Sequence, residues 1–183
     1  MVYKITWFIR RLIYFIINPN MHFYGYLGKP ICIRGFHSIK LKRKTRIFPG
    51  VRLECHGKGS SITIEDNTSI GQNFHCTSGG SLLIGRDTVI SGNVCITNID
   101  HDYSKIGTPV LNQSHIINDT EIGSNCFIGF GAVIQAGTVL GDQCIVGANS
   151  VVRGVFPPFS VIVGSPAKIV KKYNLENNDW SRV

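Results

Sequence analysis

A chain of 183 residues is long enough for one domain with a sizeable hydrophobic core, and too short for a second catalytic domain beside it. Only 16% of the residues are charged, yet the net charge is +8, which favours anionic partners in general. The sequence has no nucleic-acid module signature, no GxxxxGK[ST] motif and no GxGxxG motif. Nucleic-acid binding, nucleotide hydrolysis and a Rossmann cofactor therefore lack support.

The first predicted element is an amphipathic helix over residues 1–20, ended by Asn18-Pro19. Three cations divide it into apolar runs too short to span a bilayer, namely Lys4, Arg10 and Arg11. One helical face is aliphatic and holds Ile5, Ile9, Leu12, Ile13 and Ile16. Two interpretations stay open: the helix packs on its own body or a neighbouring subunit, or it contacts a membrane surface as a peripheral helix.

The long middle of the chain, residues 21–165, is dominated by a repeat of six residues. Aliphatic residues stand at 122, 128, 134, 140, 146 and 152, and the position four further on is small or β-branched. The same period returns upstream between Ile64 and Ile96, whereas residues before 60 fit it poorly. A short strand followed by a tight turn, three times per coil, explains this period, so we expect an all-β solenoid of stacked parallel coils.

Six cysteines are spread along the repeat, at positions 32, 55, 76, 95, 126 and 144. They form no CxxC pair, and Cys126 and Cys144 occupy small-residue positions of the repeat. We therefore predict buried free thiols in a reducing cytosol.

The repeat is interrupted between Ile96 and Ile122, which are not separated by a multiple of six. The interruption contains Tyr103 and Pro109, which a narrow coil interior would not accept. We predict a loop over residues 100–117 that leaves the coil and carries His101 where it departs. Loops held at both ends by a rigid scaffold are common sites of chemistry.

The last part of the repeat reads GANSVVRGVFPPFSVIVGSPAKIVKK from residue 147. With the period of six and the loop that carries a histidine, it resembles the hexapeptide-repeat acyltransferases, in their sugar and polysaccharide O-acetyltransferase branch. The resemblance implies a left-handed parallel β-helix, a C-terminal helix and tail over residues 166–183, and a homotrimer.

The resemblance also implies that His101 is the general base. A sugar hydroxyl attacks a thioester poorly unless its proton is removed, and an imidazole can take that proton and pass it to the leaving thiolate. Its other nitrogen needs a partner. Asp100 is our first choice, with Asp102 and Glu121 as alternatives.

For the acceptor, the resemblance points to Asn73 and His75 in GQNFHCTSGG, and we add Asp102 from the loop. A carbonic-anhydrase branch of the same fold holds zinc with three histidines. Its ligand spacing is missing after His101, so we predict no metal.

For the donor, the resemblance implies acetyl-CoA bound between subunits. Its pantetheine arm would lie along Gly129, Phe130 and Ala148, and its phosphates near Lys168 and Lys171. Where related enzymes commonly have Thr-Lys, this chain has Arg153-Gly154, so Arg153 is the expected substitute for the missing lysine charge.

Together these features predict a cytoplasmic acetyltransferase that moves an acetyl group from acetyl-CoA to a sugar hydroxyl in bacterial lipopolysaccharide or capsule biosynthesis. It would work in the cytoplasm or peripherally at the inner membrane, on a saccharide that is free or lipid-linked. Two alternatives remain: an N-acetyltransferase of a small or nucleotide-linked amino sugar, and a non-catalytic trimeric scaffold.

Overall fold

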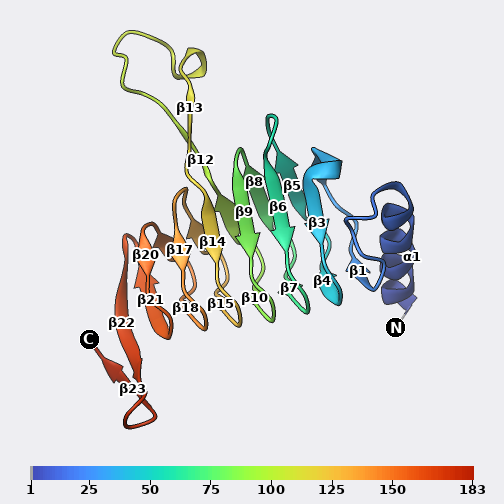
Figure 1. The fold of residues 1–183 in the computed structure, drawn as a ribbon. Helices are drawn as coiled ribbons and strands as arrows, with labels where there is room; N and C mark the ends of the chain where they lie inside the picture. The colour runs from blue at the N-terminus through green and yellow to red at the C-terminus, as the bar shows by residue number, and fades with distance from the viewer. Residues whose placement is uncertain (1) are drawn as a thin grey trace.

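The computed structural model describes residues 2–183 as a stack of β-coils with a helix at one end (Figure 1). Three sheets form the sides of a prism, and each of six coils contributes one parallel strand to every sheet. The first sheet has three further strands, of which the last two are antiparallel. The first sheet contains β1 (Gly25–Leu27), β4 (Thr45–Ile47), β7 (Ser69–Ile70), β10 (Val89–Ile90), β15 (Phe127–Ile128), β18 (Ile145–Val146), β21 (Ser160–Gly164), β22 (Ala167–Asn174) and β23 (Asp179–Arg182).

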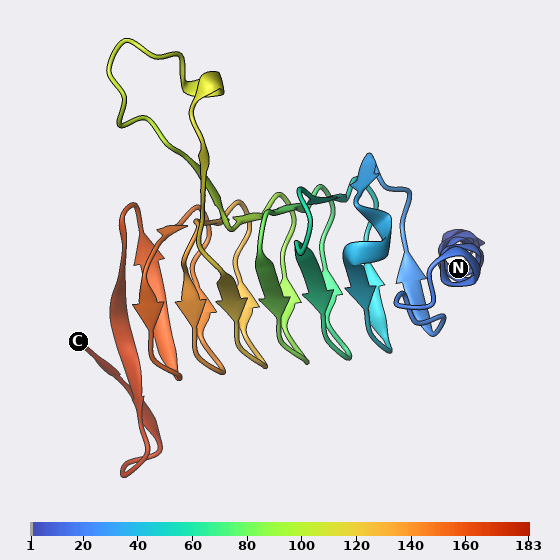
Figure 2. The ribbon, with the colours of Figure 1, turned by 45° about the horizontal axis from the view of Figure 1, so that its top comes forward.

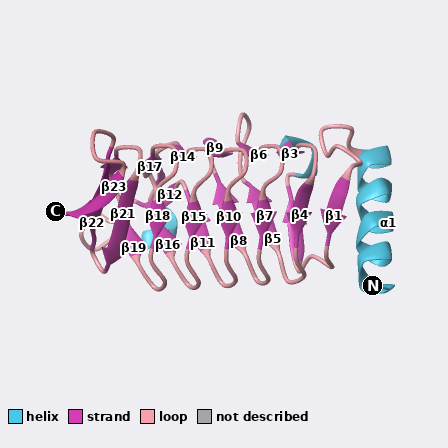
Figure 3. Cartoon of the chain, turned by 90° about the horizontal axis from the view of Figure 1, so that it is seen from below, coloured by secondary structure: helices cyan, strands magenta, loops and turns pink. Residues whose placement is uncertain are grey.

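The second sheet contains β2 (Cys32–Arg34), β5 (Arg52–Cys55), β8 (His75–Ser78), β11 (Cys95–Thr97), β16 (Val133–Ile134) and β19 (Val151–Val152). The third contains β3 (Ile39–Leu41), β6 (Ser61–Ile64), β9 (Ser81–Ile84), β14 (Thr120–Ile122), β17 (Val139–Leu140) and β20 (Val155–Phe156). Seen from below, the coils follow one another along a single axis (Figure 3). The predicted parallel solenoid is confirmed.

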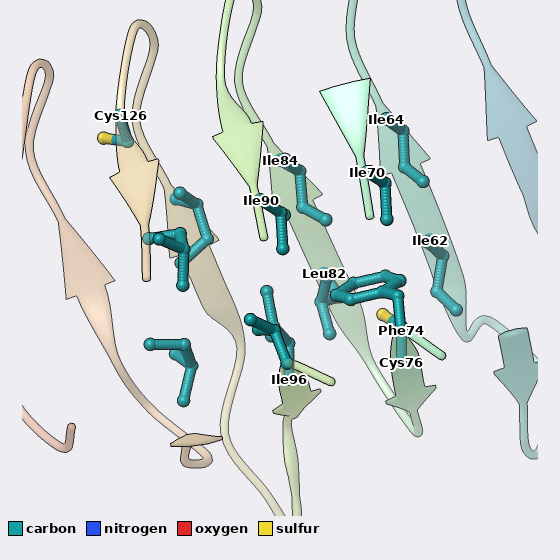
Figure 4. Close-up of a cluster of buried hydrophobic side chains, with 14 of the residues drawn as sticks. Ile62, Ile64, Ile70, Phe74, Cys76, Leu82, Ile84, Ile90, Ile96 and Cys126 are labelled. Carbon is teal, nitrogen blue, oxygen red and sulfur yellow. The ribbon is translucent and has the colours of Figure 1, made fainter. Parts of the chain in front are cut away.

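The period of six places one aliphatic side chain of each strand inside the prism. Ile70 pairs with Ile90 and Ile90 with Ile128 in the parallel register, and all three are essentially inaccessible to solvent. Figure 4 shows Ile64, Ile70, Ile84 and Ile90 projecting into this interior. Because equivalent residues stack from coil to coil, the core is continuous along the whole axis.

Residues before 60, which fit the repeat poorly, also form regular coils. Leu27 and Leu41 are fully buried and Ile33 packs against the core. Ile33 follows Leu27 by six residues, whereas Leu41, which pairs in register with Ile64, follows Ile33 by eight. The period is hidden because turns of different length separate the strands, including the short 3-10 helix η1 (Phe36–Ser38).

The cysteines are free thiols, four buried and two, Cys32 and Cys95, half-buried. Burial raises the pKa of Cys55 to about 11 and that of Cys126 to about 12. These thiols stay protonated at neutral pH and act as small apolar residues of the core.

Helix α1 (Val2–Ile17) lies across the N-terminal end of the stack (Figure 2). Arg11 is fully buried, and its guanidinium donates to the carbonyl oxygens of His22 at 2.6 Å and Leu41 at 2.9 Å. Burial lowers the pKa of Arg11 to about 9, so it remains charged at neutral pH. Trp7 packs on Phe48 from the same side of the helix.

The helix therefore packs on its own body, as one of the two interpretations predicted, but not with its aliphatic face. Ile5, Ile9, Leu12, Ile13 and Ile16 point outwards and are 39% to 72% exposed. No helix in residues 2–183 is long and apolar enough to cross a membrane.

The predicted C-terminal helix over residues 166–183 is wrong. β22 turns back antiparallel onto β21, and β23 pairs with β22. The open edge of β21 offers unpaired backbone groups, and a β-branched segment, Ile169-Val170, satisfies them as a strand. Tyr173 packs on Phe159 and Trp180, which holds this hairpin on the last coil.

Candidate active site

The loop leaves the prism between the second and third sheets, after β11. Strands β12 (Ile99–His101) and β13 (His115–Ile117) form its antiparallel neck, and the tip includes the 3-10 helix η2 (Val110–Asn112). Figures 1 and 2 both show it projecting from the side of the stack. The predicted loop over residues 100–117 is confirmed.

A buried asparagine fixes the base of this neck. Asn98 is fully buried; its Oδ1 accepts from the backbone N–H of Gly79 at 2.7 Å, and its Nδ2 donates to the Ser78 hydroxyl at 3.0 Å. The Asn98 carbonyl accepts from the N–H of Asn118 at 3.0 Å, which closes the two ends of the loop. The exit and return of the chain are thus tied to the preceding coil.

The corner of that preceding coil is made of two glycines, Gly79 and Gly80, because the neck needs the space above them. A Cβ on Gly79 would lie 2.5 Å from Cδ1 of Ile117 and 3.2 Å from Ile99. The neck therefore packs its two isoleucines directly on the glycine backbone.

His101 lies at the end of the neck, opposite a second histidine. In the antiparallel register His101 pairs with His115, and the centroids of the two rings are 4.7 Å apart in an edge-to-face arrangement. His101 is exposed to solvent.

A cavity of about 370 Å³ opens below this pair and is lined by His56, His75, Cys95, His101 and His115, with Thr77, Thr97 and Ile99. Its floor is the surface of β8 and β11 in the second sheet. The cavity unites four of the six histidines of the chain. It offers several neutral or cationic hydrogen-bonding groups to a polar ligand.

His75, predicted to bind the acceptor, lies in this cavity with His101. Its Nε2 lies 3.0 Å from the Thr77 hydroxyl and 3.7 Å from the Glu54 carboxylate. The Arg52 guanidinium donates to that carboxylate at 2.6 Å and lowers the pKa of Glu54, so Glu54 is an anion near His75.

The Asp100 carboxylate forms an ion pair with Arg153, whose Nη2 lies 2.7 Å from Oδ2, and within residues 2–183 it has no hydrogen bond to the His101 ring. This pair connects the neck to the corner between β19 and β20, two coils further along the stack. The expected orientation of His101 by Asp100 is therefore not what the structure shows. Glu121 is exposed on β14, where its backbone pairs with Leu83 and Val139.

A second cavity, of about 510 Å³, lies on the other side of the neck and is lined by Asp100, His101, Asp102, Tyr103, Ser104, Ile116 and Arg153. Asp102 Oδ1 accepts from the N–H of Ser104 at 2.9 Å, and this hydrogen bond lowers the pKa of Asp102. Asp102 thus shapes the loop while its carboxylate faces a cavity shared with His101.

Asn73 lies elsewhere, at the corner between the first and second sheets. Its backbone is left-handed (φ 56°), and its Nδ2 donates to Asn93 Oδ1 at 3.0 Å in the next coil. It lines neither cavity of the neck. Asparagine tolerates this left-handed backbone well, so the turn alone accounts for Asn73 at this position.

Four of the residues predicted for the donor gather at that same corner in later coils. A Cβ on Gly129 would lie 2.6 Å from the N atom of Ala148, so these two corners are in close contact, with the exposed Phe130 beside them. Lys168 pairs with Val163, whose side chain lies against Gly147. Lys171 is further along β22, opposite Val161, and Arg153 is at the other corner with Asp100.

Two histidines that line the cavity below the neck, His56 and His115, are not among the site residues predicted from the sequence. His56 directly follows β5, and its backbone N–H donates to the Ser78 carbonyl at the end of β8 in the next coil. Its place after a strand of the repeat is therefore the sequence signal that puts it beside β8. No periodic signal marks His115, because its position depends on the neck pairing. Residues 2–183 contain no group of three or more His, Cys, Asp and Glu placed to hold a metal ion.

The coils carry the signature of a known class. A family model described as "Bacterial transferase hexapeptide (six repeats)" matches residues 119–154. A putative lipopolysaccharide biosynthesis O-acetyl transferase, WbbJ of Escherichia coli K12, is 36% identical over 84% of this chain and 81% of its own length. The chain therefore belongs to the hexapeptide-repeat transferases, acetyltransferases built on a left-handed parallel β-helix.

Other proteins are similar in sequence at lower identity or in fold. A probable acetyltransferase of Mycobacterium tuberculosis, Rv3034c, is 29% identical over 91% of this chain, which spans only 56% of that protein. Among solved structures, a galactoside acetyltransferase in complex with coenzyme A superposes with a TM-score of 0.63 at 19% identity, over 92% of this chain and 72% of that one. A variant of AntD, an N-acyltransferase from Bacillus cereus, in complex with an amino sugar nucleotide and coenzyme A, gives 0.68 at 18% identity, over 81% and 80% of the two chains.

Proposed function

We propose that this protein transfers an acetyl group from acetyl-CoA to a hydroxyl of a saccharide in bacterial lipopolysaccharide or capsule biosynthesis. The observation that carries the proposal is the position of His101, exposed on a rigid neck and shared by two cavities. The 36% identity with a protein described as a lipopolysaccharide O-acetyl transferase supports the choice of acceptor.

His101 is the proposed general base. It removes the proton of the acceptor hydroxyl while the oxygen attacks the thioester carbonyl, which forms the new C–O bond. The C–S bond then breaks, and the imidazolium returns the proton to the leaving thiolate of CoA. Base catalysis of this kind contributes about 10² to 10⁴ in rate.

The groups around the neck suit a sugar acceptor. His75, Thr77 and Thr97 present a histidine and two hydroxyls on one side of His101, while Asp102 lies on the other. Sugar hydroxyls both donate and accept hydrogen bonds, so mixed donors and acceptors are the expected lining. Asn73 lies at a different corner and lines neither cavity, so the proposed acceptor site does not include it.

The proposed donor site is the stacked corner of Gly129, Phe130 and Ala148, with Lys168 and Lys171 near the phosphates. Residues with little or no side chain let the pantetheine arm approach the backbone. Because this corner and the neck lie on different edges of one prism, a complete site requires the neck of one copy to face the corner of another. We therefore propose a homotrimer, acting in the cytoplasm where acetyl-CoA is available.

The acceptor class is tested by incubating the wild-type protein with acetyl-CoA and a matched panel of hydroxyl-only and amino sugars, free and nucleotide-linked. Free CoA release is measured together with the product mass. An ester product, lost in mild base, supports O-transfer, whereas a base-stable amide would assign the N-acetyltransferase alternative. CoA binding without release from any acceptor would favour a non-catalytic scaffold.

A further inference from the structure

The outer face of α1 is a continuous apolar surface, consisting of Ile5, Phe8, Ile9, Leu12, Ile13, Ile16 and Ile17. Their exposed fractions lie between 36% and 72%. The helix cannot rotate to bury them, because Arg11 on the opposite face and Asn18 directly after the helix donate to backbone carbonyls of the first coil. An aliphatic stripe of this size, fixed towards solvent, is typical of an interaction surface.

Charge is concentrated in the same part of the chain. The 53 residues before Glu54 contain 11 Lys and Arg and no Asp or Glu, a net charge of +11. Residues 54–183 contain the other 8 of the 19 cations and all 11 acidic residues, a net charge of −3. The net positive charge of the protein therefore comes from α1, the first coil and the start of the second coil.

Cations and aromatic rings meet beside the helix. A cavity of about 430 Å³ is lined by Phe8, Tyr24, Gly25, Tyr26, Lys44, Arg46 and Asn67. A neighbouring cavity of about 540 Å³ is lined by His22, Phe23, Tyr24, Arg43 and Lys44. Amphipathic aromatic rings next to exposed cations are the residues that proteins place at the headgroup level of a bilayer.

We propose that the N-terminal end of this protein binds the surface of an acidic phospholipid bilayer. Helix α1 lies in the plane of the surface, with its aliphatic face among the upper acyl chains. Arg43, Lys44 and the other cations of this end contact lipid phosphates. The proposal is independent of acetyl transfer, because none of these residues belongs to the cavities of the neck.

The composition of the surface favours lipid over other anionic partners. Nucleic acid would need cations on the outermost face, but aliphatic side chains project there. A protein partner seated on the helix would match its apolar face but would not explain the absence of any acidic residue before Glu54. A bilayer surface accounts for both features, since it provides an apolar layer beneath negative phosphates.

The test is co-sedimentation of the full chain with vesicles of phosphatidylcholine alone and of phosphatidylcholine mixed with phosphatidylglycerol. We expect binding to the acidic vesicles to be at least about tenfold tighter, and to weaken as salt is raised. The double variant Ile9→Glu with Ile13→Glu should weaken binding to acidic vesicles by at least about tenfold, because it places two charges in the apolar face.

A matched control carries the same charge change on the loop, Ile106→Glu with Leu111→Glu, where both residues are 89% or more exposed. It should bind vesicles like the wild type. A second variant, Arg43→Glu with Lys44→Glu, should abolish the preference for acidic vesicles and leave the helix unaltered. Circular dichroism checks that every variant is folded.

Three results would overturn the proposal. The first is no binding of the wild type to acidic vesicles, or equal binding by the α1 variant. The second is release of the wild type from acidic vesicles when double-stranded DNA is added at the same phosphate concentration as the lipid. That result would mean that the cations bind nucleic acid. The third is an α1 variant that binds vesicles normally but has lost its oligomeric state in light scattering, which would make the apolar face a contact between copies of the chain.

Discussion

At the edge of the prism between the second and third sheets, the corners of the fourth and fifth coils differ in whether the chain runs directly into the next strand. In the fifth coil, Gln135 to Thr138 make a tight turn; Thr138 is fully buried, and its hydroxyl donates to the carbonyls of Gln135 at 2.7 Å and Val152 at 3.1 Å. In the fourth coil, the buried Asn98 side chain makes hydrogen bonds to Ser78 and Gly79 of the preceding coil, but the chain then leaves the prism for the neck and loop. The residue that closes the corner, Asn98, is thus different from His101, the proposed base on the neck.

The largest effect on stability should come from the interior of a regular coil. Ile134→Ala removes a fully buried side chain and should reduce the free energy of unfolding by about 2–5 kcal/mol. Ile106→Ala, at a loop residue that is 95% exposed, should change it by less than about 0.5 kcal/mol. Denaturant unfolding of both variants measures the contrast; similar losses would mean that the loop tip is part of the cooperative fold.

A smaller effect on stability is expected at Asn98, which closes the corner and also supports the neck. Asn98→Ala leaves the Gly79 N–H without its acceptor, and should reduce the free energy of unfolding by about 1–3 kcal/mol. It should also lower activity, because the neck loses its support. Thr138→Ala, at the regular corner, is the control: it should lose similar stability while the activity at temperatures well below unfolding is retained. Unchanged activity in Asn98→Ala would show that the neck holds its position without that asparagine.

The smallest effect on stability is expected at the ion pair between Asp100 and Arg153. Both side chains are partly exposed, so Arg153→Gln should change the free energy of unfolding by less than about 1 kcal/mol. If the pair positions the neck, Asp100→Asn and Arg153→Gln should lower kcat equally, and the double variant no further. Additive losses would instead give Arg153 a separate role, such as the expected contact with CoA phosphates.

The fold could be predicted from the sequence because the period of six is a local signal, repeated at Ile128, Ile134 and Leu140. The loop was predictable for the same reason, as the place where the period fails. The strand β22 was not, because its conformation depends on the free edge of β21. The contact of His101 with His115 and the pairing of Asp100 with Arg153 join residues 14 and 53 positions apart. Neither contact follows the repeat.

The aliphatic face of α1 illustrates the same limit. The sequence indicated the face correctly, but the choice of the side that packs depends on Arg11, whose partners come from His22, Leu41 and Lys42. A buried cation whose guanidinium donates to three carbonyls outweighs the usual preference for burying aliphatic residues, because a buried charge has to be paired with hydrogen-bond acceptors.

The central claim is that His101 performs the chemistry while the coils only hold it in place. It is tested most directly by measuring the rate of acetyl transfer and the thermal midpoint of His101→Ala beside the wild type, with His37→Ala as a control histidine outside both cavities. We predict a loss of at least about 100-fold in kcat at an unchanged midpoint, because the side chain is exposed and removed only from the reaction. An equal rate in the two proteins would contradict the account and assign the base to another residue.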